Sequence, residues 1–303
     1  MKSKEIESLY WDNDFKTFFY KAQKNIEFTE IHSIFDKVIN IKSDKGILYT
    51  ISNNTTDNAP YTLKIDYDGS FKDIINENEK ILKNENEIII GNMKINLSNV
   101  DLWDIQRKKI KKIPISEINK NIDIFNILIE EVGKNGGCKY HYLIRFLNIE
   151  NNSGSLIEKE LSKRIDKFYS NLKLNNIKKE DINNLIGLGM GLTPSGDDFL
   201  TGFLGTINIF DINKNLFNKI KEYISLPLTS TTDVSSAMIK AAVEDKYREY
   251  LNDFIYSFLE RDENKFLKSF KNLLKIGSSS GTDMSVGVVL GFLYTIQQNE
   301  MEE

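Results

Sequence analysis

The sequence holds very little of the residues that build disulfides and metal sites: its 303 residues include one cysteine, two histidines and four prolines. Cys138 alone cannot form a disulfide framework, and zinc sites that need several cysteine or histidine ligands are excluded. Positive charge is not in excess either, because 44 acidic side chains outnumber 40 basic ones. The resulting net charge of −4 offers no support for nucleic acid as a partner.

Long hydrophobic runs are also missing. The longest apolar stretches, 199–210 and 286–296, fall short of the roughly 18–20 residues that cross a membrane. The first seven residues lack the basic-then-apolar pattern of a secretory signal. We therefore expect a cytoplasmic protein with no membrane partner.

The sequence does contain enough apolar material for burial, since 40% of its residues are hydrophobic. That amount supports one large core or two ordinary ones. Short β-like runs separated by turn residues begin near residue 33, and helical spacing takes over after Pro114. Strands followed by helices, without alternation, indicate the α+β class. We predict a β-rich N-terminal domain with an opening helix over 1–118 and an all-helical domain over 119–303.

In the N-terminal domain, aromatic and aliphatic residues at mixed helical spacing predict one or two opening helices over 4–23. Two turns, Asp44-Lys45-Gly46 and Gly91-Asn92, are expected to join neighbouring strands as hairpins. Alternation of apolar and polar side chains over 63–67 favours an antiparallel sheet. The predicted strands are 34–41, 47–51, 61–67, 87–90, 93–97 and 100–103.

In the helical domain, apolar residues recur every three to four positions. The basic run 107–112 has two interpretations, an anion-binding patch or a solvated segment. His32, His141 and Cys138 stand outside any recognisable nucleophile motif and are expected to be structural. The predicted helices are 122–132, 156–172, 179–186, 195–210, 214–224, 232–242, 247–259, 263–276 and 283–296.

The glycines are concentrated, with ten of the 17 in two short stretches, 187–205 and 277–291. Residues 187–202 read Gly-Leu-Gly-Met-Gly-Leu-Thr-Pro-Ser-Gly-Asp-Asp-Phe-Leu-Thr-Gly. The residues before this segment look helical, and the third glycine interval of a dinucleotide fingerprint is missing. No Gly-Lys-Ser/Thr follows, so the segment is not a Walker loop either.

Pro194 cannot lie inside a helix, so we expect a helix to begin just after it, capped by Thr193 or Ser195. Asp197 and Asp198 then fall in the first turn. Backbone N–H groups of the glycine loop can bind an anion or a polar carbonyl. The two carboxylates can alternatively hold Mg²⁺, an ammonium or an amide group. The remaining alternative is a well-capped buried helix with a flexible entry.

A second stretch repeats this pattern. Ser-Gly-Asp-Asp-Phe-Leu-Thr-Gly at 195–202 matches Ser-Gly-Thr-Asp-Met-Ser-Val-Gly at 280–287, with Ser, Gly, Asp and Gly at the same offsets. Gly202 and Gly287 each lie one turn after an aspartate, where glycine lets another backbone approach closely. We expect two tightly packed helices whose N-termini meet at one pocket. The hydroxyl-rich segment 230–236 predicts a third helix start, either part of that pocket or an ordinary N-cap.

The 187–202 motif, Thr-Thr-x-x-Ser at 231–235 and Ser-Ser-Gly-Thr-Asp at 279–283 together resemble one family. That family includes the H subunit of oxamate carbamoyltransferase, an enzyme of anaerobic allantoin breakdown. The resemblance implies a part in carbamoyl transfer among oxalurate, phosphate, oxamate and carbamoyl phosphate, alongside companion subunits. The Ser-x-Arg-Thr phosphate element of aspartate and ornithine carbamoyltransferases is missing. Either this chain binds phosphate in a different way or it supplies only part of a site that a partner completes, and we favour the second.

The predicted site takes a small anionic substrate, of carbamoyl or phosphate type, at the meeting helix N-termini, with no metal or cofactor. The residues expected to be catalytic are Asp197, Asp198 and Asp283. Those expected to bind the substrate are Gly187, Gly189, Gly191, Thr193, Ser195, Gly196, Thr231, Thr232, Ser235, Ser279, Ser280 and Gly281. The alternative is a non-catalytic metabolite-binding or scaffold protein that uses the same pocket.

Overall fold

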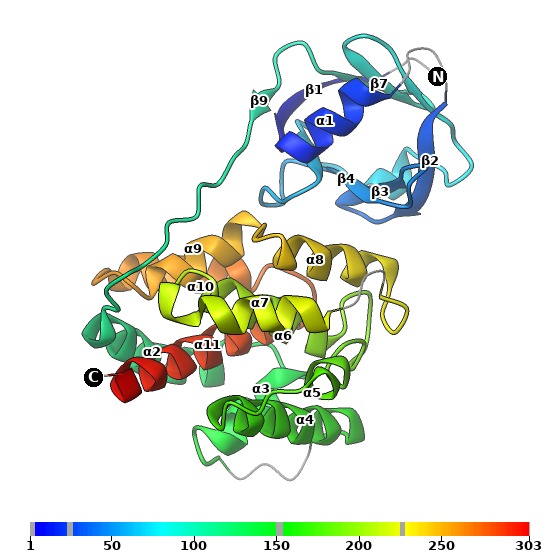
Figure 1. Cartoon of the computed structure of the whole chain (residues 1–303). Coiled ribbons are helices and arrows are strands. Elements are labelled where there is room, and N and C mark those ends of the chain that lie inside the picture. Colours follow the sequence, from blue (N-terminus) through cyan, green and yellow to red (C-terminus); the bar gives the residue numbers. More distant parts are fainter. Residues whose placement is uncertain (1–3, 23–26, 150–153, 225–227, 303) are drawn as a thin grey trace. The chain divides into compact units, whose positions relative to one another are not determined.

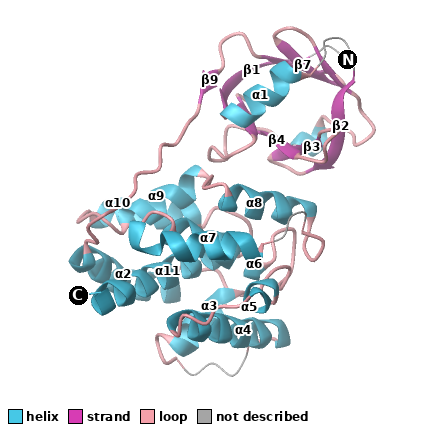
Figure 2. Ribbon diagram, in the orientation of Figure 1, coloured by secondary structure: helices cyan, strands magenta, loops and turns pink. Residues whose placement is uncertain are grey.

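In a computed structural model the chain divides into two compact units, Met1–Gln106 and Arg107–Glu303 (Figure 1). The structure describes residues 4–22, 27–149, 154–224 and 228–302. Strands lie in the first unit and helices dominate the second, as Figure 2 shows. The predicted α+β class, with a β-rich region followed by helices, is therefore confirmed.

The first unit is a closed β-barrel with one helix, α1 (Asn13–Lys21), packed into it. Its strands follow the order β5-β4-β3-β2-β6-β7-β8-β1, and β1 pairs with β5 to close the ring, while β9 extends from β1. Phe15 and Phe19 of α1 are fully buried in the barrel core. The strands are β1 (Lys4–Trp11), β2 (Glu27–Ile34), β3 (Val38–Lys42), β4 (Leu48–Ser52), β5 (Thr62–Ile65), β6 (Ile81–Lys83), β7 (Glu87–Ile90), β8 (Met93–Asn96) and β9 (Asp101–Leu102).

The expectation of an antiparallel sheet is wrong in part, because the barrel is mixed. β1 runs parallel to both β8 and β9, and β4 runs parallel to β5. Strand β5, whose alternation suggested antiparallel pairing, has β4 parallel on one side and β1 antiparallel on the other. Alternation of apolar and polar side chains along a strand indicates that one face of its sheet is buried. It does not indicate whether the neighbouring strand runs parallel or antiparallel.

Residues 4–11 form strand β1, so the helix predicted over 4–23 is confirmed only for 13–21, and residue 23 lies outside the described residues. The helix begins late because the Asp12 carboxylate caps it, accepting from the N–H groups of Asp14 and Phe15. The two predicted hairpin turns do join β3 to β4 and β7 to β8. Strands β2 and β6 were not predicted, and the strand predicted over 34–41 contains the turn between β2 and β3.

The second unit is a bundle of helices in which each predicted helix is present, with ends shifted by a few residues. One helix, α3, was not predicted. The helices are α2 (Ile115–Glu131), α3 (Cys138–Arg145), α4 (Leu156–Lys173), α5 (Lys179–Asn183), α6 (Ser195–Ile207), α7 (Lys214–Tyr223), α8 (Asp233–Val243), α9 (Glu249–Ser257), α10 (Glu263–Leu273) and α11 (Ser280–Glu302). None of the helices in the described ranges is long and apolar enough to cross a membrane.

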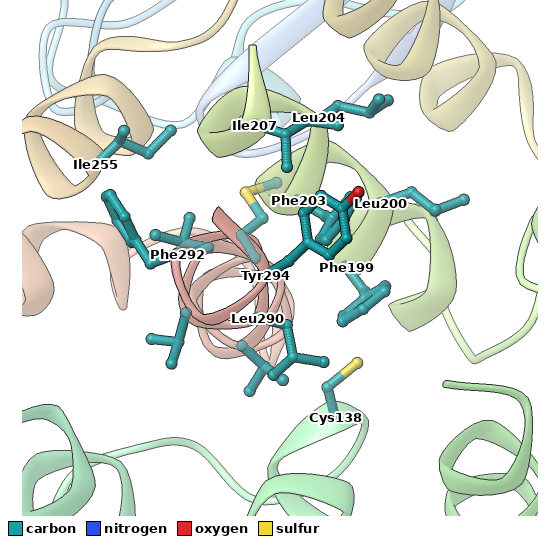
Figure 3. Close-up of a cluster of buried hydrophobic side chains, with 14 of the residues drawn as sticks. Cys138, Phe199, Leu200, Phe203, Leu204, Ile207, Ile255, Leu290, Phe292 and Tyr294 are labelled. Atoms are coloured by element: carbon teal, nitrogen blue, oxygen red, sulfur yellow. The ribbon is translucent and has the colours of Figure 1, made fainter. Parts of the chain in front are cut away.

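Helices α6 and α11 form the centre of this unit. Every residue of α6 is buried, and its apolar side chains share one core with those of α11 (Figure 3). A Cβ added at Gly202 would overlap the backbone carbonyl of Met284, and one at Gly287 would overlap that of Phe199. The close backbone approach that the glycine spacing predicted is therefore confirmed.

The boundary between the two units lies between Gln106 and Arg107, whereas the boundary predicted from the sequence lies between residues 118 and 119. The Ile110 N–H donates to the Ile209 carbonyl at 2.6 Å, which ties this segment to the helical unit. Arg107 is neither solvated nor open to an anion, because its buried guanidinium donates to the Asp245 carboxylate and to the Gly205 carbonyl. The lysines at 108, 109, 111 and 112 are exposed.

Candidate functional site

The glycine-rich loop enters α6 through Pro194, which occupies the N-cap position and makes no side-chain capping bond. The expectation that Thr193 or Ser195 caps this helix is therefore wrong. The Thr193 hydroxyl instead shares a hydrogen bond of 2.8 Å with the Ser280 hydroxyl at the start of α11. Ser195 is buried in the first turn. The end of the glycine-rich loop and the first residue of α11 thus meet through their hydroxyl side chains.

Asp197 joins the glycine loop to the start of α8. One carboxylate oxygen accepts from the Gly187 N–H at 2.8 Å. The other accepts from the hydroxyls of Thr231 and Ser235, the latter at 2.6 Å. Burial raises the pKa of Asp197, and these three donors oppose that rise. Asp197 therefore anchors the loop and has its acceptor positions filled from within the chain.

Asp198 is fully buried, and neither of its carboxylate oxygens has a hydrogen-bond partner among the described residues. Burial, together with the negative charge of Asp283, raises its pKa well above the usual value. The hydroxyls of Ser280 and Thr193 oppose this rise only in part. A buried carboxyl group without partners is costly unless it binds a proton or a ligand.

Asp283 occupies the same place in the first turn of α11 and is also fully buried. One of its oxygens accepts from the Cys138 N–H at 2.6 Å, while the other has no partner in the described part of the chain. Burial raises the pKa of Asp283 to about 6, and the Cys138 N–H opposes the rise. Asp198 and Asp283 therefore form a pair of buried carboxyl groups in which three of the four oxygens lack partners.

The start of α3 belongs to this site, although the sequence analysis did not include it. Gly137 has a φ of 56°, and a Cβ there would overlap the Asp283 carboxylate. The Cys138 thiol donates to the Ser195 carbonyl at 3.6 Å, and burial raises its pKa well above the usual value. The signal available in the sequence is Gly136-Gly137 directly before Cys138.

The glycines allow backbone segments to approach one another closely, because glycine has no Cβ. A Cβ at Gly187 would overlap the Ser230 carbonyl, and one at Gly189 would overlap the Ser195 amide. At Gly191 there is no such neighbour, but its φ of 89° still favours glycine. A Cβ at Gly196 would meet the Leu185 carbonyl, just after α5, and one at Gly281 would meet the Leu273 carbonyl at the end of α10.

Several backbone N–H groups that were expected to line a pocket donate within the chain. Thr232 does cap α8, since its hydroxyl accepts from the Ser235 N–H at 3.0 Å, and the same hydroxyl donates to the Leu192 carbonyl. The other such pairs are Gly196 N–H to Leu188 O, Asp197 and Asp198 N–H to Pro194 O, Gly281 N–H to Ile276 O, and Asp283 N–H to Ser279 O. These donors are not available to an anion without rearrangement.

Metal binding finds no support in the described residues, where no group of three or more His, Cys, Asp or Glu side chains is arranged to hold an ion. The two histidines offer no general base at the carboxyl pair. His141 is buried against the Ser162 hydroxyl, and burial lowers its pKa to about 3. His32 lies in the other unit, beside Ser33.

Comparison with known proteins identifies relatives of both units. The family model described as oxamate carbamoyltransferase subunit AllH matches residues 185–292, the segment that holds the glycine loop, α6, α8 and the first part of α11. The model of the AllH family N-terminal domain matches residues 7–102, which is most of the barrel. No solved structure matches the chain. The two models together cover most of the sequence, and the chain therefore belongs to the AllH family of oxamate carbamoyltransferase subunits.

Proposed function

We propose that this chain takes part in carbamoyl transfer in allantoin breakdown, between oxalurate or oxamate and carbamoyl phosphate, by binding the carbamoyl group at Asp198 and Asp283. The observation that carries the proposal is the buried carboxyl pair, with three oxygens that lack partners in the described residues. A carbamoyl group presents N–H donors beside a carbonyl acceptor. A pair of one neutral and one ionised carboxyl presents the complementary donor and acceptor.

The protonation of the pair follows from its surroundings. Two carboxylates that lie close together in a buried site cannot both stay ionised without a cation, and the pair then titrates as a unit. Both groups have raised pKa values, and that of Asp198 is raised further by the charge of Asp283. Asp198 therefore serves as the neutral acid that donates to the carbamoyl oxygen, and Asp283 as the acceptor for its N–H group.

The remaining predicted residues have supporting roles in this proposal. Asp197, with Thr231 and Ser235, anchors the loop over 187–193, and Thr193 and Ser280 place hydroxyls beside Asp198. Because Asp198 is fully buried, the substrate enters only when this loop opens. The other predicted residues that support the site in this proposal are Gly187, Gly189, Gly191, Ser195, Gly196, Thr232, Ser279 and Gly281.

The anionic end of the substrate needs a different partner. Oxamate and oxalurate carry a carboxylate and carbamoyl phosphate a phosphate, whereas the three motifs contain no arginine. Several backbone donors of the helix starts already bond within the chain. We therefore assign the cationic part of the site to a companion subunit of the transferase complex, where arginine suits carboxylate and phosphate groups.

A non-catalytic role, in which the same site binds a metabolite, is the second candidate. One observation favours it: the three motifs contain no arginine, so they offer no guanidinium to a phosphate leaving group. Loss of Asp198 should lower turnover if the chain is an enzyme subunit, and should lower only the affinity for the metabolite if it is a sensor.

The test uses the chain assembled with its companion subunits and compares Asp198→Ala with Asp12→Ala, a change at a buried carboxyl of the barrel unit. Alanine removes the donor, whereas asparagine would keep one. An enzyme subunit loses turnover by about 100-fold or more in Asp198→Ala, with its circular dichroism unchanged. A sensor loses affinity for oxamate in calorimetry and keeps the turnover of the complex. If Asp198→Ala changes neither turnover nor oxamate affinity relative to Asp12→Ala, the site assignment is wrong.

A further inference from the structure

The two carboxyl groups of the pair differ in one respect, which is the contact with α3. The Cys138 N–H, at the first residue of α3, donates to Asp283 at 2.6 Å across 145 residues of sequence. No described group does the same for Asp198, whose two oxygens lack partners. The start of α3 therefore acts on one member of the pair only.

Gly137 makes this contact possible. It is the N-cap residue of α3 with φ 56° and ψ −133°, a backbone conformation that side-chain-bearing residues rarely adopt. Any Cβ at this position would overlap the Asp283 carboxylate. Glycine thus brings the backbone close enough for the next N–H to reach the carboxylate oxygen directly.

We propose that Gly137 and the Cys138 N–H are positioning groups for the carbamoyl site, which hold Asp283 as the acceptor and leave the proton of the pair on Asp198. A donor to the ionised form favours that form, so the carboxyl with a backbone donor keeps its charge and the one without keeps the proton. This inference rests on the proposed function, because it explains how two similar aspartates come to have different roles.

The other groups around Asp283 do not make this distinction. Asp198 on α6 is the other member of the pair, and the charges of Asp283 and Asp197 raise its pKa. The Lys134 amine is held by the Gly277 carbonyl at 2.7 Å, and the Lys139 amine by the Gly133 carbonyl at 2.7 Å. The hydroxyls of Ser195 and Ser279 and the Cys138 thiol also lower the pKa of Asp283, as the hydroxyls of Ser280 and Thr193 lower that of Asp198. The Cys138 N–H is therefore the backbone donor that distinguishes the two carboxyls in the described residues.

The side chain of Cys138 makes a separate contact, to the Ser195 carbonyl, so the effects of the backbone and of the thiol can be tested apart. Cys138→Pro removes the N–H at the first helical position, where proline is tolerated. Cys138→Ala removes the thiol and retains the N–H. The two variants are matched in position, and the proline variant alone loses the N–H; its ring Cδ takes the place of that hydrogen, so the Asp283 carboxylate must also move away from it.

The experiment titrates the full chain by the infrared band of protonated carboxyl groups, with Asp283→Asn used to assign the Asp283 contribution. In Cys138→Pro the midpoint of that contribution should rise by about one pH unit, while in Cys138→Ala it should stay within about 0.3 of the wild type. An unchanged midpoint in folded Cys138→Pro, or equal shifts in both variants, would overturn the inference.

A second measurement needs no proline variant. In the wild-type chain, the amide proton resonance of Cys138 should shift with pH at the midpoint of Asp283, and this titration should vanish in Asp283→Asn. An amide that does not titrate, or that still titrates in Asp283→Asn, contradicts the positioning role. Neither measurement includes a substrate, so a failure here is distinct from a failure of oxamate binding in the assembled complex.

Discussion

The starts of α6 and α11 have the same Ser, Gly, Asp and Gly at the same offsets, yet their aspartates lie in different environments. Asp283 accepts a backbone N–H from α3, and Asp198 makes no such bond. The residue before each aspartate differs as well: Asp197 in α6 anchors the glycine loop, and Thr282 in α11 accepts the Lys134 N–H at 3.0 Å. The shared residues build a pair of helices, and the neighbours of each helix decide its chemistry.

Gly202 of α6 and Gly287 of α11 make equivalent contacts. The Gly202 position faces the Met284 carbonyl, and the Gly287 position faces the Phe199 carbonyl, in a reciprocal contact. This reciprocity brings the first turns together and therefore brings Asp198 near Asp283. Substitution of these glycines tests the contact that the two helices share. Substitution of Asp283, of Ser235 and of residues in the loop before α6 tests the features in which they differ.

The largest effect is expected from Gly202→Ala or Gly287→Ala. Each new Cβ meets a backbone carbonyl, which cannot turn aside as a side chain would, so each change should lower the free energy of unfolding by about 4 kcal/mol. Gly205→Ala is the control within α6, because its Cβ meets the end of the Ile255 side chain. Urea unfolding followed by circular dichroism gives the comparison, and equal losses in all three variants would refute the backbone contact.

The next effect concerns the charge of Asp283 and its pH dependence. Its pKa is about 6 in the folded chain against 3.8 as the ordinary value, so the folded state holds the proton more tightly. Stability from this group is therefore fully present below about pH 4 and is lost as pH rises through 6, by about 3 kcal/mol in total. Asp283→Asn removes this loss.

The measurement is the difference in unfolding free energy between the wild type and Asp283→Asn at pH 4 and at pH 8. The variant should gain relative to the wild type on going to pH 8. Asp12 of the barrel, whose pKa is also raised to about 6, is present in both proteins and cancels. A difference that is the same at both pH values would show that Asp283 does not hold its proton in this way.

A smaller effect is expected at Asp197, the residue with no counterpart in α11. Ser235→Ala removes one hydroxyl donor from this buried carboxylate and should cost about 2 kcal/mol. Ser236→Ala, at the next position of α8, is the control. The loss should appear as a lower Tm in calorimetry for Ser235→Ala alone. Similar Tm values for both variants would mean that Asp197 does not depend on its donors.

The smallest effect is expected in the loop that precedes α6. Met190 has 75% of its surface exposed, so Met190→Ser should change the free energy of unfolding by less than about 0.5 kcal/mol. Leu188 packs against the helical core, and Leu188→Ser should cost about 2 kcal/mol. Chemical denaturation of both variants distinguishes them, and a large loss in Met190→Ser would show that the loop tip makes contacts of its own.

Much of the helical unit could be predicted from the sequence because its signals are local. Apolar residues at helical spacing and a proline or hydroxyl at the start were sufficient for α6, α8 and α10. Helix α3 was not predicted, because it is short, has aliphatic side chains only at Leu143 and Ile144, and follows an N-cap glycine that has no side chain to signal a helix start. In the barrel, strand β1 was mistaken for a helix because its aromatic residues fit either period.

The sequence by itself determined that α6 and α11 pack closely, because only glycine at 202 and 287 leaves room for a facing backbone. It also determined that aspartates lie in their first turns. Only the tertiary structure decided which aspartate anchors a loop, which accepts an N–H and which has no partner, and it likewise decided the strand directions of the barrel. At these sites the hydrogen-bond partners and the groups that bury each side chain come from segments distant in the chain. The spacing of residues within one segment therefore cannot predict them.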